Sequence, residues 1–207
     1  MKLFCIFVNG KKCFVMKQLY IVLISLFICL GVGAQTTIAT SYTAATNSYA
    51  TGLTFNVNNT NSYPIRIRGL NFGNGSWGTL PTTTLQVWVK SAAINGVPGA
   101  ISAGNGWTLA GAKILNGEEI NFFDVFSQLA IDIPANSTYG IYITSSNNVA
   151  GFLMATGVRD TFSGAGVNLI TGNLISYGGT VTGPTSTQAG LMQYIVVDNP
   201  SACSGKP

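Results

Sequence analysis

The sequence has 207 residues, of which 47% are hydrophobic and 8% charged, with no histidine and a formal net charge of +4. Four of the ten basic residues are lysines within the first 34 residues, so the rest of the chain has six basic and six acidic side chains. This neutrality removes the electrostatic footprint that nucleic acid or an anionic membrane requires, and neither is expected as a partner. The missing histidine excludes Ser-His-Asp and Cys-His catalysis and the commonest metal ligand.

Residues 16–34 have the plan of a secretory signal peptide. Lys17 supplies the positive start, an apolar run follows over residues 19–30, and small residues close the segment. About twelve apolar residues are too few to span a bilayer, which takes roughly 20, so a cleaved signal is favoured over the alternative, an uncleaved anchor. We therefore expect a signal-peptide helix, Met16 as the true start, and a mature protein that is secreted or held at the outer cell surface without membrane contact.

The cysteines fit an exported protein. Cys5, Cys13 and Cys29 lie in the leader, which leaves Cys203 as the single cysteine of the mature chain. An odd cysteine in an exported protein suggests a partner elsewhere, so Cys203 either pairs within a longer chain or is a free thiol on the tail. The core has to be stable without disulfides, which about 170 residues achieve by apolar burial.

From residue 35 onward the pattern is that of an all-β protein. Apolar residues occupy every second position in short segments, turn-forming clusters separate the segments, and no window sustains a helical period. In chain order, the first half is predicted to contain a lead-in or edge strand at 36–50, a hairpin of 53–57 with 64–72, a loop at 73–81, a strand at 85–90 and an exposed excursion at 91–106. A bulge at Gly69 brings Ile67 and Leu70 to one face.

The second half opens with the strongest short hairpin signal of the chain, the Asn116-Gly117 step. In chain order, this half is predicted to contain a hairpin of 107–115 with 119–126, a hairpin of 129–133 with 138–144, a strand at 149–156, a loop at 157–166, short strands about Leu169 and Ile175, a loop at 178–190 and a strand at 191–197. The last strand is apolar nearly throughout, which favours a central position with both faces buried. Asp132 alternates with buried positions and is interpreted as a surface charge.

These segments amount to about nine to eleven strands in one domain. Their number and spacing favour two packed antiparallel sheets, a jelly-roll-like or immunoglobulin-like β-sandwich, with a barrel as the alternative. We expect the sandwich to span residues 35–198, after a signal peptide at 1–34 and before a linker that starts at 199–207.

Paired carboxylates are the remaining route to catalysis, because glycoside hydrolysis uses two of them roughly 5 to 10 Å apart. Glu118 and Glu119 are neighbours, so on a strand they point to opposite faces, and they follow a turn where exposed charge is expected. Asp124 is isolated in the sequence. A hydrolase built on these residues is therefore disfavoured against a non-catalytic protein, and no motif indicates a cofactor or a metal ion.

Aromatic side chains are the other candidates for a site, because exposed rings stack on sugars as readily as buried rings pack in cores. Trp77 lies in a glycine-rich loop, and Tyr63 and Tyr177 lie on strands or near turns. These three residues are the candidate ligand contacts. Trp88 and Trp107 are predicted to pack against a sheet instead.

Several segments together carry a resemblance: G-L-T-F-N-V-N-N-T at 52–60, P-I-R-I-R-G-L at 64–70, L-Q-V-W-V-K at 85–90, G-W-T-L-A-G at 106–111, I-P-A-N-S-T-Y-G-I-Y-I-T at 133–144 and the tail N-P-S-A-C-S-G-K-P. With them, residues 36–207 resemble the N-terminal β-sandwich modules of large exported surface proteins of gliding Gram-negative bacteria. The resemblance implies that fibronectin type III-like modules and a C-terminal type IX secretion sorting domain follow the Cys-Ser-Gly-x-Pro linker. It brings no catalytic residues.

The combined pattern favours a non-catalytic, exported β-sandwich module that acts in cell-surface adhesion or as a structural spacer. Its partner is expected to be a polysaccharide or another surface protein. The alternative is a carbohydrate-binding accessory module of a secreted multidomain protein. Contacts are expected in the loops at 73–81 and 91–106, and because the sequence stops at the linker, downstream modules of the same chain are expected in a longer protein.

Overall fold

The computed structural model of the chain describes residues 35–40, 45–48, 50–73, 82–96, 98–116, 122–145, 152–156, 160–176, 181–182, 188–190 and 192–198. Apart from the short 3₁₀ helix η1 (Ala103–Asn105), the regular structure of these residues is all β. None of the described helical structure is long and apolar enough to cross a membrane. The predicted signal peptide at 1–34, most of the loop at 73–81, and the linker at 199–207 with Cys203 lie outside the described residues.

The described strands form two larger sheets and one small one. They are β1 (Gln35–Ala39), β2 (Ala45–Ser48), β3 (Ala50–Asn59), β4 (Ile65–Gly73), β5 (Thr83–Lys90), β6 (Thr108–Leu115), β7 (Phe122–Phe126), β8 (Ile131–Ile133), β9 (Ser137–Ser145), β10 (Phe152–Thr156), β11 (Thr161–Gly164), β12 (Val167–Ser176), β13 (Val181–Thr182), β14 (Gln188–Gly190) and β15 (Met192–Asp198).

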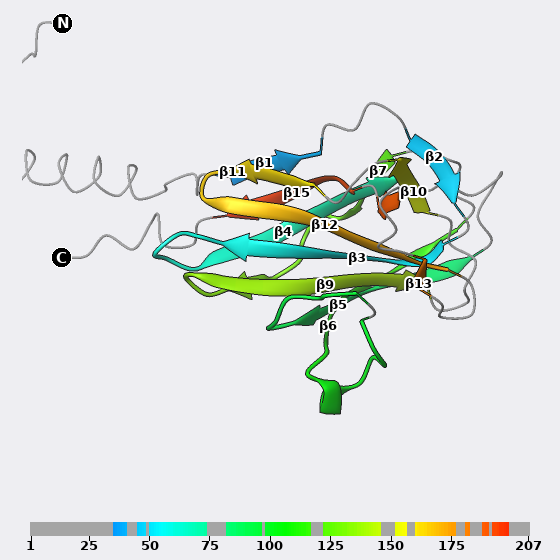
Figure 1. Cartoon of the computed structure of the whole chain (residues 1–207), viewed down its shortest axis with the longest axis horizontal. Helices are drawn as coiled ribbons and strands as arrows, with labels where there is room; N and C mark the ends of the chain where they lie inside the picture. Colours follow the sequence, from blue (N-terminus) through cyan, green and yellow to red (C-terminus); the bar gives the residue numbers. More distant parts are fainter. Residues whose placement is uncertain are drawn as a thin grey trace, which may run out of the picture.

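The two larger sheets lie against each other (Figure 1). The first sheet has the order β1-β15-β4-β7, with β8 also paired to β4, and the second has the order β11-β12-β3-β9-β5-β6, with β13 also paired to β12. We call them the five-stranded and the seven-stranded sheet; β14, β10 and β2 form the third. All described pairings are antiparallel, and the main paths of the larger sheets hold ten strands, so the predicted antiparallel β-sandwich is confirmed.

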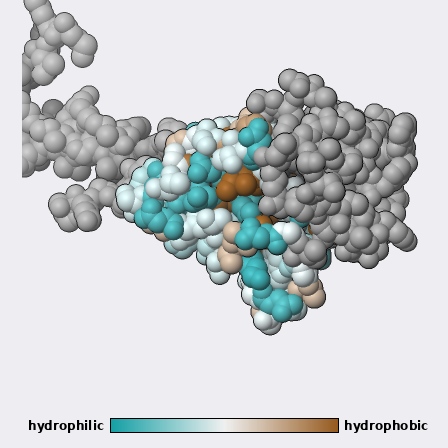
Figure 2. Space-filling view, viewed as in Figure 1, coloured by the Kyte–Doolittle hydropathy of each residue, from teal (hydrophilic) through white to brown (hydrophobic). Residues whose placement is uncertain are grey.

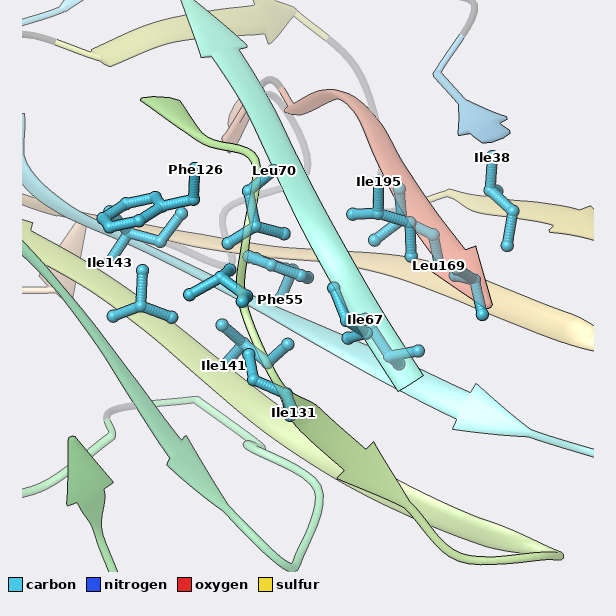
Figure 3. Packing of buried hydrophobic residues seen from close by; sticks show 14 of the residues in the cluster. Ile38, Phe55, Ile67, Leu70, Phe126, Ile131, Ile141, Ile143, Leu169 and Ile195 are labelled. Carbon is cyan, nitrogen blue, oxygen red and sulfur yellow. The ribbon is translucent and has the colours of Figure 1, made fainter. Parts of the chain in front are cut away.

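One hydrophobic core fills the space between the larger sheets. On β3, Leu53, Phe55 and Val57 are almost fully buried, as the period-two pattern predicts. Alternate positions of β4, β8 and β15 supply the opposite side of the core. Figure 3 shows side chains of both sheets, such as Leu70 and Phe55, pointing into this shared space. Burial of apolar surface, at about 25 cal/mol per Å², is the main force that holds the two sheets together.

The predicted bulge in β4 is present. The ladder between β4 and β15 shifts register beside Gly69, and as a result Ile67 and Leu70 both point into the core although they are three positions apart. A side chain at Gly69 would lie 3.1 Å from the Phe126 carbonyl oxygen. The close approach of β7 at this point therefore favours glycine.

The three predicted hairpins are wrong, and for the same reason. β3 pairs with β9 and β12, whereas β4 pairs with β15, β7 and β8; likewise β6 pairs with β5 and β7 with β4. β8 and β9 also lie in opposite sheets. In each predicted hairpin the chain crosses from one sheet to the other instead. The alternating pattern predicts that the apolar face of each strand lies in the core. It does not show whether the next strand in the sequence pairs beside it in the same sheet or packs across the core in the other sheet.

The loops predicted at 157–166 and 178–190 also need correction, because they contain β11, β13 and β14. These strands have only two to four residues each, too few to show a period-two pattern in the sequence. The two short strands predicted about Leu169 and Ile175 form the single strand β12, which is interrupted only by an irregular register. Pairing with β3 along most of its length keeps β12 continuous.

The predictions for the two ends of the domain are confirmed in position. β1 is an edge strand, and β15 lies between β1 and β4, inside its sheet. The prediction that the last strand is buried on both faces is wrong for the side chains described. Ile195 and Val197 are buried, whereas Val196 and Asp198 are partly exposed. β-Branched residues fit an exposed sheet face as well as a buried one, so composition did not separate the two.

One buried side chain ties two of the sheet crossings together. Asn59, at the end of β3, is fully buried, and its amide nitrogen lies 2.9 Å from the Tyr63 carbonyl oxygen, 3.2 Å from that of Ile133 and 2.9 Å from that of Pro134. Its amide oxygen accepts hydrogen bonds from the backbone and side-chain nitrogens of Asn61. The crossing after β3 and the crossing after β8 are therefore joined through a single amide.

The same crossing also binds the turn between β11 and β12. The backbone N–H and the hydroxyl of Thr60 donate to the Gly166 carbonyl oxygen at 2.8 and 2.7 Å, and the Asn61 side chain donates to that of Ala165 at 3.0 Å. Gly166 has a φ of 72°, and a Cβ there would lie 2.3 Å from Asn61 Oδ1. Glycine is required at this position on both counts.

We expect Asn59→Ala to lower the free energy of unfolding by about 3 kcal/mol, because it leaves buried carbonyl groups of two crossings without a donor. Asn58→Ala is the matched control, since Asn58 is half-buried on the opposite face of β3 and its loss should cost less than about 1 kcal/mol. Urea unfolding of the full chain, followed by fluorescence, measures both. An equal loss of stability in the two variants would contradict the role given to Asn59.

Candidate functional site: a loop clamped to the seven-stranded sheet

The acidic residues do not form a site in the described part of the chain. No three His, Cys, Asp or Glu side chains among the described residues are grouped so that they could hold a metal ion. Glu118 and Glu119 lie outside the described residues, and so does the side chain of Asp124. The hydrolase alternative therefore gains no support and stays a prediction.

Two ion pairs lie on the outer face of the five-stranded sheet. Arg66 and Asp132 face each other on β4 and β8, with Nε 2.5 Å from Oδ1 and Nη2 2.7 Å from Oδ2. Arg68 Nε lies 2.5 Å from Asp198 Oδ2 on β15. Hydrogen bonding by Arg66 lowers the pKa of Asp132, and the carboxylate raises the pKa of Arg66. Asp132 points outward, as predicted, and accepts two hydrogen bonds from Arg66. The two ion pairs link β4 to β8 and to β15.

One of the three predicted ligand contacts lies among the described residues. Tyr63 is half-buried in the crossing after β3, where it packs against the main core, and its carbonyl oxygen accepts from Asn59. Trp77 and Tyr177 lie outside the described residues. Tyr63 therefore has a packing role, and the ligand contacts of all three residues stay predictions.

The clearest candidate for a functional site is the loop between β5 and β6. The excursion predicted at 91–106 is exposed at most of its positions, but Ile94 and Trp107 are only 6% and 3% exposed. The loop extends away from the sheets beyond β6, with η1 at its end (Figure 1). The prediction of an exposed excursion is therefore correct for most of the described positions, including residues 98–106, which we call the loop tip, and wrong at Ile94 in the loop base, residues 91–96.

Two buried asparagines clamp the base of the loop. Because Leu53 and its alternate neighbours on β3 face the core, Asn56 points to the outer face of the sheet. Asn56 Nδ2 donates to the Ile94 carbonyl oxygen at 3.1 Å, and the Ile94 N–H donates to Asn56 Oδ1 at 2.8 Å. Asn173 Nδ2, on β12, donates to the Gly96 carbonyl oxygen at 2.9 Å. Buried amides with satisfied hydrogen bonds hold a segment rigidly, so the loop base is fixed to two strands.

Glycines make room for this clamp. A Cβ at Gly140 on β9 would lie 2.4 Å from the Ile94 side chain, and one at Gly172 would lie 2.1 Å from the Thr54 carbonyl oxygen. Gly172 stands at the irregular register of β12, where the Asn173 N–H donates to the Thr54 hydroxyl at 2.9 Å. Any larger residue at either position would push the loop or the strand away.

A small aromatic cluster supports the loop from below. The ring centroids of Trp107 and Tyr142 are 6.2 Å apart, with the planes tilted by 59°. Lys90 Nζ lies 6.0 Å from the centroid of the Trp107 ring, within the range of a cation–π contact. Burial raises the pKa of the Tyr142 hydroxyl. The packing predicted for Trp107 is confirmed, and Trp88 packs against the same cluster while part of its surface stays exposed.

The loop tip has its own hydrogen bonds. Asn105 Nδ2 donates to the Ala100 carbonyl oxygen at 2.9 Å, the Asn105 N–H donates to that of Ser102 at 3.1 Å, and Gly106 ends η1 with a φ of 78°. The tip contains no charged residue. On the face shown in Figure 2, hydrophilic and neutral colours prevail and strongly hydrophobic colour is confined to a small area. The tip therefore offers backbone groups, small side chains and polar groups to a partner, without charge.

No protein-family model matches the sequence, and no curated protein matches it significantly. The resemblance to exported surface modules therefore rests on the sequence motifs. The site is defined by its geometry, a rigid base and an ordered, uncharged tip.

We expect Asn56→Ala to loosen the loop, because both of the hydrogen bonds that hold Ile94 are lost. Cleavage of the loop by a non-specific protease under native conditions should become at least about tenfold faster, corresponding to about 1.4 kcal/mol of local stability. Asn58→Ala, on the same face of β3, should leave cleavage unchanged; if it accelerates cleavage equally, the clamp is not specific to Asn56.

Proposed function

We propose that this protein is a non-catalytic, exported β-sandwich module that acts in cell-surface adhesion or as a structural spacer, and that it makes contact through the loop tip. The observation that carries the proposal is the double clamp of Asn56 and Asn173 on the backbone at Ile94 and Gly96. This clamp holds an uncharged tip away from the sheets (Figure 1).

A clamped loop suits recognition for a thermodynamic reason. Ordering a flexible loop on binding costs conformational entropy, and a loop that is already held in place avoids most of this cost. Binding residues of β-sandwiches commonly lie on loops that a rigid scaffold positions. A tip without charge fits a partner that is read through hydrogen bonds and shape, so another surface protein or a polysaccharide is the expected partner.

Export is part of the proposal and is supported by the sequence. Residues 16–34 have the charge, length and small terminal residues of a cleaved signal peptide. The hydrophobic cluster between the two larger sheets, as far as the structure describes it, contains no cysteine. A neutral mature chain is compatible with a position outside the cell, where it meets neither nucleic acid nor the inner membrane surface.

We expect the double substitution Ala100→Glu and Ala103→Glu to weaken binding of the full chain to whole cells or to a purified surface partner at least about tenfold, because it places two charges on the uncharged tip. Both positions are exposed, so the unfolding temperature should not change. Ala112→Glu, exposed on β6 away from the tip, is the matched control. Unchanged binding by the double variant would exclude the tip as the contact surface.

Carbohydrate binding is the second candidate, and the exposed part of Trp88 favours it. Trp88 lies on the outer face of β5, its indole N–H donates to Gln86 Oε1 at 3.2 Å, and it lies opposite the exposed Leu109 on β6. An aromatic ring beside an amide side chain is a suitable surface for stacking on a sugar ring. Trp77, in the glycine-rich loop, is the alternative platform.

We expect Trp88→Ala, or Trp77→Ala if the loop is the platform, to abolish retention of the full chain on one member of a panel of insoluble polysaccharides. Loss of a stacking aromatic removes about 1 to 3 kcal/mol, or roughly a tenfold to hundredfold change in affinity. Leu109→Ala, next to Trp88, is the control for non-specific hydrophobic retention. Wild-type protein that binds no polysaccharide on the panel would exclude this candidate and leave the adhesive proposal standing.

A further inference from the structure

Of the Asn-Gly steps in the sequence, Asn95-Gly96 and Asn105-Gly106 lie wholly within the described residues. Asparagine followed by glycine is the sequence most prone to spontaneous deamidation, because the unhindered glycine nitrogen can reach the side-chain amide carbon. Both steps lie in the loop between β5 and β6, one at its clamped base and the other at its tip. The structure distinguishes them sharply.

The step at the tip is restrained at both reacting groups. Asn105 Nδ2 donates to the Ala100 carbonyl oxygen at 2.9 Å, and the Gly106 N–H donates to that of Ala103 at 2.9 Å. The attacking nitrogen and the leaving amide must both give up a hydrogen bond before the ring can close, which slows the reaction at this step.

The step at the base has neither restraint. Asn95 is exposed, and neither its side chain nor the Gly96 N–H makes a hydrogen bond to another described residue. Gly96 has a φ of 77°, and the space where a Cβ would lie is open to 4 Å. Water and the Gly96 nitrogen can therefore reach the Asn95 amide.

We infer that Asn95 is a site of spontaneous deamidation and that the modification releases the clamped loop. The Gly96 nitrogen loses its proton to hydroxide and forms a bond to Asn95 Cγ; Nδ2 then takes a proton from water as the Cγ–Nδ2 bond breaks, and ammonia leaves, giving a succinimide. Water then opens the ring at either carbonyl carbon, giving aspartate or isoaspartate. No oxidant or reductant takes part, and the net change is uptake of water and loss of ammonia.

The consequence follows from the position of Asn95 between the two clamps. Ile94, on one side, is held through its N–H and carbonyl oxygen by Asn56, and Gly96, on the other, is held through its carbonyl oxygen by Asn173. Aspartate keeps the backbone length and its charge lies in solvent, because Asn95 is exposed, whereas isoaspartate adds one methylene to the backbone between these points. With isoaspartate the two clamps cannot both be kept, so the loop detaches from the sheet.

The test is to age the full chain in mildly alkaline buffer and to follow each Asn-Gly step by peptide mapping and by isoaspartyl methyltransferase labelling. Asn95 should convert at least about tenfold faster than Asn105, given the two hydrogen bonds that restrain the latter step. Native-state proteolysis of the loop should rise in proportion to the isoaspartate fraction. Asn95→Gln should block both changes, because its ring closure is much slower, whereas Asn105→Gln should block neither.

Conversion of Asn105 as fast as that of Asn95 would overturn the assignment of the site. Conversion of Asn95 to isoaspartate without faster proteolysis of the loop would overturn the proposed release. The inference does not depend on what the loop binds, because neither readout uses a ligand.

Discussion

The buried amide of Asn59 supplies hydrogen bonds to the backbone where the chain crosses between the sheets after β3 and after β8. A crossing leaves carbonyl groups at the end of the core without a ladder partner, and each buried carbonyl without a donor costs about 1 to 3 kcal/mol. Asn59 lies within hydrogen-bonding distance of three carbonyl groups in two crossings, of which that of Ile133 is buried and those of Tyr63 and Pro134 are partly buried. With both crossings fixed side by side, β3 pairs with β9 in one sheet while β4 pairs with β8 in the other.

The strand that ends in Asn59 also controls the loop. β3 buries Phe55 and its alternate neighbours in the core, and on its outer face it presents Asn56 to the loop base. Since β3 lies between β12 and β9, the second clamp, Asn173, and the close approach at Gly140 come from its direct neighbours. The loop base is therefore held by the strands that lie over the main core.

The sequence was sufficient for the features that depend on local alternation. The inward positions of β3, the bulge at Gly69 and the antiparallel sandwich all follow from period two. The hairpin predictions were wrong because two segments joined by a turn have the same alternating sequence pattern whether they pair in one sheet or face each other across the core. The clamp could not be predicted, for another reason. In the sequence Asn56 is an ordinary polar residue on the outward face of a strand, and its partner Ile94 is 38 positions away. The lack of charge from 91 to 106 was the one signal available.

The free edge of the seven-stranded sheet bears on how the module makes contacts. β6 ends the sheet, and Leu109 and Ile114 on it are 44% and 61% exposed, so strand addition by a partner is the obvious alternative to the loop tip. Three features oppose it. A bulge at Ala110 breaks the regular edge, Lys113 lies opposite the core-facing Leu85 and puts a charge on the inward side, and the loop extends beyond β6 (Figure 1). These are the devices by which natural sheets prevent edge pairing, so they disfavour strand addition along β6 and are in keeping with the proposed contact through the loop tip.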